Sequence, residues 1–406
     1  MTYIRNTSPV TDAPVPAAAG IAAPLVGPDL PARERMLISG TSLDDDIWGS
    51  SGPDRIEGGE GNDRIHDHMG DNLMLGGAGN DTIAGTGTFR GGPGNDILVG
   101  SGTFLFDRGD GRDQIGQDGF VTYLGEQVGD TRYSHLRDSV LRFGAGIDPA
   151  SIVLVRRRDD LEFDVGDDEA VTVSRWFVDR DARLGAVEFA DGTHWSRQRI
   201  AGMALHIAGT GGDDTLEGGA HNDTIVGEGG RDIIFDDRGW NMLFGDEGDD
   251  LIMGSGGLAG GAGDDILVGR GHLMDNTYFY DRGDGHDQIF IHGDSNRRAR
   301  ADTMEFSADL DVQDLWFQRR GDDLVVTLVG GTDGVTINDW YLGPAHQVAR
   351  FRLGADKVMG AAHVDALVQA MSGFSPPQGA GSVLETHSRQ ALAPVLATSW
   401  SDTRAG

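Results

Sequence analysis

Residues 76–84 read Gly-Gly-Ala-Gly-Asn-Asp-Thr-Ile-Ala, and residues 260–268 read Gly-Gly-Ala-Gly-Asp-Asp-Ile-Leu-Val. Both are copies of a nine-residue unit that recurs in phase along two blocks of the chain. The unit has glycines at positions one, two and four, an acidic or amide side chain at position six, and an aliphatic residue at position eight. A repeat of fixed period determines the fold before any other feature, because every copy builds the same local structure.

The two blocks are a tandem duplication. Position six is occupied by Asp54, Asp63, Asn72 and Asp81 in the first block and by Asp223, Asp232, Asn241 and Asp250 in the second. Equivalent residues are 169 positions apart, and both blocks contain one shortened unit, at residues 85–90 and 254–259. Both also end on nearly the same phrase, at residues 107–115 and 281–289. Shared irregularities of this kind indicate descent from one ancestral block.

The aliphatic position predicts the core. A three-residue strand follows each glycine turn, and its single apolar side chain is expected to point inward. The expected stacks are Ile56, Ile65, Met74, Ile83 and Leu98 in the first block and Ile225, Ile234, Leu243, Ile252 and Leu267 in the second. Two units make one coil, so turns on the same side are expected 18 residues apart.

The carboxylates of stacked turns would lie above one another and repel unless a cation sits between them. Calcium fits this arrangement, because it is a hard ion that takes six to eight oxygen ligands and accepts carbonyls beside carboxylates. The glycines are expected to allow positive φ in a tight turn and close approach of backbone carbonyls to the ion. Asp45, Asp63 and Asp81 share one side of the first coil, whereas Asp54 faces Asn72 on the other. Calcium is therefore expected to concentrate on the first side, with roughly three or more ions per roll.

The units resemble the RTX (repeats-in-toxin, haemolysin-type) calcium-binding nonapeptide, which folds as a parallel β-roll. A disordered Gly/Asp linker is the alternative, and the strict phasing of the aliphatic position argues against it. The resemblance implies several calcium ions as cofactors. The residues expected to hold them are Asp45, Asp54, Gly58, Gly59, Gly61, Asp63, Asn72, Gly76, Gly77, Gly79, Asp81, Gly91, Gly92, Gly94, Asp96, Asp113, Asp214, Gly218, Gly219, Asp223, Gly227, Gly229, Asp232, Asn241, Gly245, Asp250, Gly260, Gly261, Gly263, Asp265 and Asp287.

A second element follows each block. Residues 161–165, Leu-Glu-Phe-Asp-Val, alternate apolar and acidic side chains as a half-buried strand does, and residues 324–328 form the corresponding strand of the second copy. These segments resemble the β-rich domain that often follows RTX repeats, and a solenoid needs such caps at its open ends. Trp176 and Trp340 close the two segments. Core packing is the expected role of these tryptophans, and a ligand-stacking pair is the alternative.

The expected fold is all-β, with two parallel β-rolls that are each followed by a small β-rich capping domain. The expected domains are a flexible Pro/Ala-rich lead at 1–35, the first roll at 36–118, its cap at 119–204, the second roll at 205–292, its cap with a terminal helix at 293–372, and a C-terminal tail at 373–406. The tail resembles an uncleaved type I secretion signal in composition and position, and an ordinary disordered tail is the alternative.

Composition restricts the partners. The formal net charge is −32 and there is no cysteine, so the fold depends on no disulfide. Such acidity argues against nucleic acid or an anionic membrane as a partner. No stretch approaches the ~20 apolar residues of a membrane-spanning helix.

We find no catalytic motif. The sequence has no His-Glu-x-x-His of a zinc protease, no Gly-x-Ser-x-Gly of a lipase and no phosphate-binding loop. His66 and His68 share one coil and form a candidate metal pair, with two exposed roll residues as the expected interpretation. The chain is therefore expected not to be an enzyme.

The sequence as a whole predicts a secreted, extracellular calcium-binding protein whose rolls fold on calcium, with a structural, adhesive or surface-associated role. A type I secretion apparatus is the expected protein partner. Two alternatives stay open: a secreted enzyme with an unrecognised site in the caps, and a stand-alone secretion or folding module.

Overall fold

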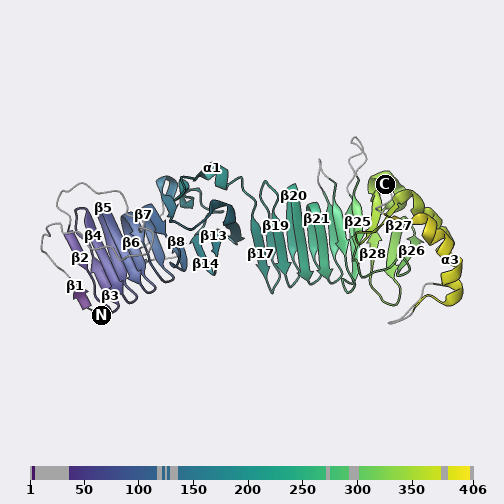
Figure 1. Ribbon diagram of the computed structural model, residues 1–406, viewed down its shortest axis with the longest axis horizontal. Helices are drawn as coiled ribbons and strands as arrows, with labels where there is room; N and C mark the ends of the chain where they lie inside the picture. Colours follow the sequence, from purple (N-terminus) through teal and green to yellow (C-terminus); the bar gives the residue numbers. More distant parts are fainter. Residues whose placement is uncertain are drawn as a thin grey trace. The chain divides into compact units, whose positions relative to one another are not determined.

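The computed structural model describes residues 2–4, 36–116, 121–123, 126–128, 136–270, 275–291, 301–375 and 383–402. The chain divides into two compact units, Met1–Met203 and Ala204–Gly406. Each unit begins as a stack of parallel strands and ends in a β-rich cap (Figure 1). Most of the predicted lead at 1–35 lies outside the described residues; within it, β1 (Thr2–Ile4) pairs in parallel with β3 (Asp45–Trp48).

The nonapeptides form the predicted parallel rolls. The first roll contains β2 (Met36–Ser39), β3, β4 (Asp54–Glu60), β5 (Arg64–Ala78), β6 (Thr82–Arg90), β7 (Ile97–Phe106) and β8 (Arg112–Ile115). The second contains β17 (His206–Thr210), β18 (Thr215–Glu217), β19 (Thr224–Glu228), β20 (Ile233–Glu247), β21 (Leu251–Ala262), β22 (Ile266–Gly269), β23 (Thr277–Tyr280) and β24 (His286–Ile291).

Strand register confirms that two units make one coil. Ile56 pairs with Met74, and Ile65 pairs with Ile83, in both cases 18 residues further along the chain. The shortened unit reduces this step, since Ile83 pairs with Leu98, 15 residues on. Because parallel pairing sets each coil directly above the previous one, equivalent side chains of successive coils lie in files.

The files of aliphatic side chains are the core of each roll. All ten predicted side chains are at most 2% exposed. Phe89 and Phe104 join the first file and stack at 4.8 Å between ring centroids. These two rings lie on the short coils, where bulky side chains fill space next to two shortened turns.

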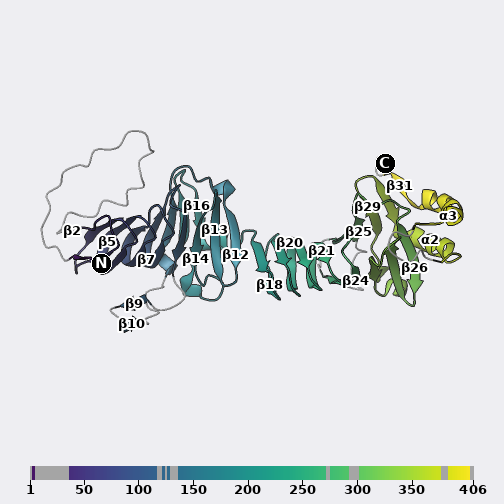
Figure 2. The ribbon, with the colours of Figure 1, turned by 90° about the horizontal axis from the view of Figure 1, so that it is seen from below.

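The caps continue the sheets of the rolls instead of packing as separate layers (Figure 2). In unit 1, β11 (Val140–Phe143) and then β15 (Ala186–Phe189) extend the parallel ladder from β7, and β14 (Glu169–Val173) extends it from β8. In unit 2, β25 (Thr303–Phe306) and β29 (Arg350–Leu353) extend β23, and β28 (Gly334–Ile337) extends β24. The last coil of each roll therefore has its backbone groups paired.

Antiparallel strands complete both caps. They are β12 (Val153–Arg157), β13 (Asp160–Gly166) and β16 (His194–Ser196) in unit 1, and β26 (Leu315–Arg320), β27 (Asp323–Leu328) and β30 (Lys357–Gly360) in unit 2. The remaining elements are the antiparallel pair β9 (Val121–Tyr123) and β10 (Glu126–Val128), helix α1 (Arg197–Ile200), and short 3₁₀ turns at Leu136–Asp138, Pro149–Ser151, Arg180–Ala182, Trp340–Leu342, Pro344–His346 and Ala361–His363.

The C-terminal segment is folded where it is described. Helix α2 (Val364–Met371) matches the predicted terminal helix, and a second helix, α3 (Thr386–Ser399), packs against it. Strand β31 (Ser401–Asp402) then pairs with β30. Leu392, Leu396 and Trp400 are at most 5% exposed in the core of unit 2. The disordered-tail alternative is therefore wrong for residues 383–402, because these apolar side chains cover the cap.

Among the described helices, none combines the length and the apolar character that crossing a membrane requires.

We expect Leu392→Ala to lower the free energy of unfolding of unit 2 by about 2–5 kcal/mol, since it leaves a cavity between α3 and the cap. Gln390→Ala, on the exposed face of the same helix, should change it by less than about 0.5 kcal/mol. Denaturant unfolding at saturating calcium measures both. Equal stability of the two variants would show that α3 does not belong to the core.

Candidate calcium-binding sites

The position-six aspartates of the first roll form one continuous hydrogen-bonded stack. The backbone N–H of Asp45 donates to Oδ1 of Asp63 at 2.8 Å, and that of Asp63 donates to Oδ1 of Asp81 at 2.8 Å. The stack continues across the shortened unit to Asp96 at 2.7 Å and ends at Asp113 at 3.0 Å. Each turn is thus tied to the next by a bond to a carboxylate, which is stronger than one between neutral groups.

The second roll repeats this stack. Asp214 donates in the same way to Asp232 at 2.8 Å, and Asp232 donates to Asp250 at 2.7 Å. Asp265 and Asp287 follow at 2.7 and 3.2 Å. The structure therefore brings together all ten predicted first-side aspartates, five in each roll.

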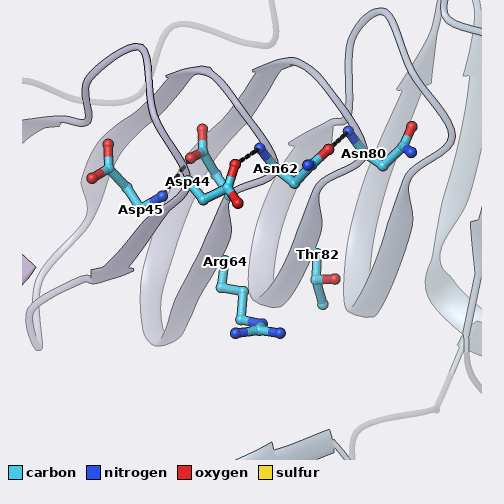
Figure 3. Close-up of a pocket in the computed structure, with 7 residues that line it drawn as sticks. Asp44, Asp45, Asn62, Arg64, Asn80 and Thr82 are labelled. Atoms are coloured by element: carbon cyan, nitrogen blue, oxygen red, sulfur yellow. Dashed lines mark hydrogen bonds between the residues drawn. The ribbon is translucent and has the colours of Figure 1, made fainter. Parts of the chain in front are cut away.

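A second ladder runs beside the first in the opposite direction. Oδ1 of Asp44 accepts the N–H of Asn62 at 2.8 Å, and Oδ1 of Asn62 accepts the N–H of Asn80 at 2.7 Å (Figure 3). These position-five side chains are exposed and accept from the next coil, whereas position six accepts from the previous one. The two ladders hold each turn from both sides and orient the position-six carboxylate into the roll.

One oxygen of each stacked carboxylate is left without a partner. Among the described residues, Oδ2 of Asp63, Asp81, Asp96 and Asp113 is buried and has no hydrogen-bond partner. The four residues are only 1–3% exposed. Asp232, Asp250, Asp265 and Asp287 show the same orphaned oxygen in the second roll. A buried charged oxygen without a partner costs several kcal/mol, which a bound cation offsets.

Glycine at position one creates the space beside these oxygens. A Cβ on Gly58 would overlap both Oδ2 of Asp63 and the carbonyl oxygen of Gly76 on the next coil. Gly58 has no positive φ, so our expectation that position one needs glycine for its backbone conformation is wrong. The space above its Cα is what requires glycine. The same arrangement recurs at Gly76, Gly227 and Gly245, where a Cβ would overlap a carboxylate and crowd or overlap a carbonyl oxygen.

Glycines at positions two and four do serve the turn conformation. Gly59, Gly77, Gly92 and Gly261 at position two, and Gly61, Gly79, Gly94 and Gly263 at position four, all have positive φ. In the second roll, position four of one unit is Gly230, with φ +107°, and not Gly229. Gly229 is therefore removed from the set of predicted turn glycines, because it stands one residue out of phase.

The remaining predicted glycines divide by position. Gly91 and Gly260 stand at position one, where a Cβ would overlap the carboxylates of Asp96 and Asp265. Gly218 is also at position one, and the N–H of Gly219 donates to Oδ2 of Asp223 at 2.5 Å.

The donor set fits calcium. Carboxylate oxygens and glycine carbonyl oxygens converge in each interturn space, with no nitrogen or sulfur ligand. Within the described part of the chain, no three His, Cys, Asp or Glu side chains gather into a metal cluster, so carbonyls must supply the other ligands. Calcium accepts such mixed oxygen ligands, whereas zinc prefers histidine and cysteine.

Burial and mutual repulsion raise the pKa values along the stack. Burial is the larger cause, and it raises the pKa of Asp81 to about 6 and that of Asp96 to about 7. At the end of the stack, burial together with the charge of Asp96 raises the pKa of Asp113 to about 9. Burial with the charge of Asp265 does the same for Asp287, to about 9. Protons therefore compete for the carboxylates that face the ions.

The second side of each roll is built differently. Oδ1 of Asn72 accepts the N–H of Asp54 at 2.9 Å, as an aspartate would. Its Nδ2 group, however, donates to the carbonyl oxygens of Asp67 and Met69 at 3.3 and 3.0 Å. Asn241 makes the corresponding bonds. The prediction that Asn72 and Asn241 are calcium ligands is therefore corrected, because their amides close the turn by themselves.

Sequence reasoning missed four buried aspartates. Asp67 and Asp236 stand at position one, where most other units have glycine, and are 4% and 3% exposed. Asp110 and Asp284 lie in the closing phrases and accept the N–H groups of Asp107 and Asp281 at 2.8 and 2.6 Å. The repeat itself carried the signal for the first pair, since both depart from the unit at equivalent places.

The other candidate side chains are structural. Trp176 and Trp340 are 3% and 2% exposed in the cap cores and cannot stack on a ligand. His66 is buried against Trp48, with ring centroids 4.3 Å apart, while His68 is exposed. The expectation that both histidines are exposed is thus wrong for His66, because its ring is covered by the tryptophan of the preceding coil.

Comparison with known families agrees with this geometry. The model described as RTX calcium-binding nonapeptide repeat (4 copies) matches residues 39–66, 68–87, 84–102, 206–234, 235–257 and 258–272. The chain is an RTX calcium-binding repeat protein. A second model, haemolysin-type calcium binding protein related domain, matches residues 160–199 and 323–353 of this RTX protein, which are cap segments. Calcium is therefore the ion that the stacks of carboxylates bind.

Among solved structures, the RTX protein is similar to the extracellular lipase LipA from Serratia marcescens at 18% identity and a TM-score of 0.22. The match covers 72% of this chain and 37% of the lipase chain. At that TM-score the similarity supports no argument about fold or activity.

Gly58→Ala is expected to raise the calcium concentration at the folding midpoint, because its Cβ would occupy the space between the Asp63 carboxylate and the Gly76 carbonyl. Overpacking of this kind costs about 1–3 kcal/mol. Gly212→Ala is the control, since nothing lies within 4 Å of its Cβ position. Circular dichroism during calcium titration measures both midpoints, and equal midpoints would contradict the assignment of the ion-binding space.

Calcium affinity is expected to rise with pH. The raised pKa values favour the protonated, calcium-free roll: this stabilisation is complete below the ordinary aspartate pKa of about 4 and is lost as pH rises through about 6–9. Calcium must displace these protons, so binding should be weaker at pH 5.5 than at pH 8 and should release protons. Isothermal titration calorimetry in two buffers of different ionisation enthalpy tests this. Binding without proton release at pH 6 would contradict it.

Proposed function

We propose that this calcium-binding protein is secreted and that its rolls fold on calcium outside the cell, where it serves a structural or adhesive role. The observation that carries the proposal is the file of buried carboxylates whose second oxygens have no partner in the protein. Without the ion, these charges and the ordering of many glycines oppose folding. Free energy of calcium binding then becomes free energy of folding.

Extracellular calcium has the concentration that such a design requires. Extracellular calcium modules typically bind at about 10⁻⁴–10⁻³ M. Cytosolic calcium lies well below that range, so the rolls would stay open and exportable inside the cell. A type I secretion apparatus that reads the C-terminal segment is the proposed route. In the unfolded chain, helix α3 would not yet be packed against α2, which would leave the segment accessible.

The caps support a structural role over an enzymatic one. In the first cap, Phe143 packs against Phe163 and Phe189, with ring centroids 6.3 and 5.3 Å apart, so the interior is filled. The buried carboxylate of Glu162 is paired with Arg112 at 2.6 Å and with Arg157 at 2.9 Å. Burial alone would raise the pKa of Glu162, but these two guanidinium groups lower it. A carboxylate that is fully paired is a poor general acid or base.

Millimolar calcium is expected to produce a cooperative gain of β-structure and protease resistance. Equal magnesium, or sodium at matched ionic strength, should give only modest compaction, because screening of net charge −32 does not depend on which ion supplies it. Magnesium demands shorter bonds in near-octahedral geometry and gives up water reluctantly. Far-UV circular dichroism with limited proteolysis in each ion measures this difference.

Two outcomes would contradict the proposal. The first is a calcium-free protein that is already β-structured and resistant to protease. The second is recovery of the folded protein from the cytosolic fraction, with none in the medium or at the cell surface, when producing cells are fractionated.

A further inference from the structure

The second side of each roll contains a carboxylate where the regular unit has none. In the regular interturn space above Gly58, the next coil contributes the carbonyl oxygen of its position-one residue. Above Gly49, the next coil contributes the side chain of Asp67 instead: the three atoms nearest to a Cβ there are its Oδ2, Cγ and Cβ. Asp67 therefore places a carboxylate in the position of a neutral carbonyl.

This carboxylate is buried, unpartnered and aimed into the space. Asp67 is 4% exposed, and its Oδ2 has no hydrogen-bond partner, while Oδ1 accepts the N–H of Met69 at 3.2 Å. It lies against the carboxylate of Asp54, which is 0% exposed and is held by the N–H and Oγ of Ser50 at 2.5 and 3.1 Å. Two buried carboxylates with a free oxygen between them require a positive charge.

The second roll contains the same arrangement independently. Asp236 is 3% exposed, with an unpartnered Oδ2 that overlaps the Cβ position of Gly218. Its neighbour Asp223 is 1% exposed and accepts from the N–H groups of Leu205 and Gly219 at 2.8 and 2.5 Å.

The two departures from the repeat compensate each other in charge. Replacement of a position-six aspartate by Asn72 removes one carboxylate from the space, and Asp67 at position one returns it. Both changes occur together again at Asn241 and Asp236. The Asn72 amide also occupies the carbonyl oxygens of Asp67 and Met69, so no further ion can use them on the next coil.

We propose that Asp54 with Asp67, and Asp223 with Asp236, each bind one calcium ion, in a site where a side-chain carboxylate at position one replaces the turn carbonyl. This proposal rests on calcium-dependent folding of the rolls. Each roll then has a series of sites on its first side and a single, terminal site on its second.

The test is the number of calcium ions bound per chain in the full-length protein. The variant Asp67→Asn/Asp236→Asn keeps side-chain volume and the acceptor for Met69 but removes both charges. The matched control is Asp71→Asn/Asp237→Asn, which neutralises an exposed carboxylate in each of the same turns. Equilibrium dialysis with radioactive calcium at saturation gives the stoichiometry, and circular dichroism confirms that each protein is folded.

We expect the double variant to bind two fewer ions than the parent and the control to bind the same number. An unchanged stoichiometry in the double variant overturns the proposal and indicates that each carboxylate pair shares a proton instead. If the double variant does not fold, Asp67→Asn alone is measured against Asp71→Asn, with a loss of one ion expected and no loss overturning the proposal. A parent that folds without binding calcium contradicts the proposed function itself, which distinguishes the two failures.

Discussion

The structure depends on one interaction: a buried aspartate that accepts a backbone N–H from the preceding coil through one oxygen and faces an ion-binding space through the other. The first contact fixes the register between coils, and the second makes that register costly without a cation. Asp63 shows both parts, with Oδ1 on the N–H of Asp45 and Oδ2 beside the carbonyl of Gly76. Fold and ligand binding are therefore the same event, since neither contact exists in an unfolded chain.

Around this interaction the roll divides its work between two faces. The inner file of aliphatic side chains gives ordinary hydrophobic burial that any β-solenoid would have. The outer file of position-five amides and carboxylates holds the turns from the opposite direction. Only the position-six file carries an unsatisfied charge, so calcium controls the roll through a small part of its contacts. Asn72 and Asn241 show the contrast, because an amide there closes its turn without an ion.

The caps solve a different problem. A parallel coil ends with a row of unpaired backbone groups, which would otherwise be open to another chain. Strands β11 and β14 extend the ladders of the first roll, and antiparallel strands then close them. The final coil also ends on the most strongly perturbed carboxylates of each roll, Asp113 and Asp287. The cap therefore covers the last ion-binding turn as well as the last edge.

The sequence by itself determined the period, the duplication, the inward file, the ion and the position-six ligands, because the repeat forces equivalent residues into equivalent places. Tertiary structure alone decided what depends on the neighbouring coil. Position-one glycine proved to be a requirement for space, Asn72 closed its own turn, and Asp67 entered the ion-binding space of the coil before it. The folding of α3 onto the cap was also hidden from the sequence, since its few buried side chains, such as Leu392, gain meaning only beside α2. Periodicity states which residues are equivalent; contacts between coils state what each exception does.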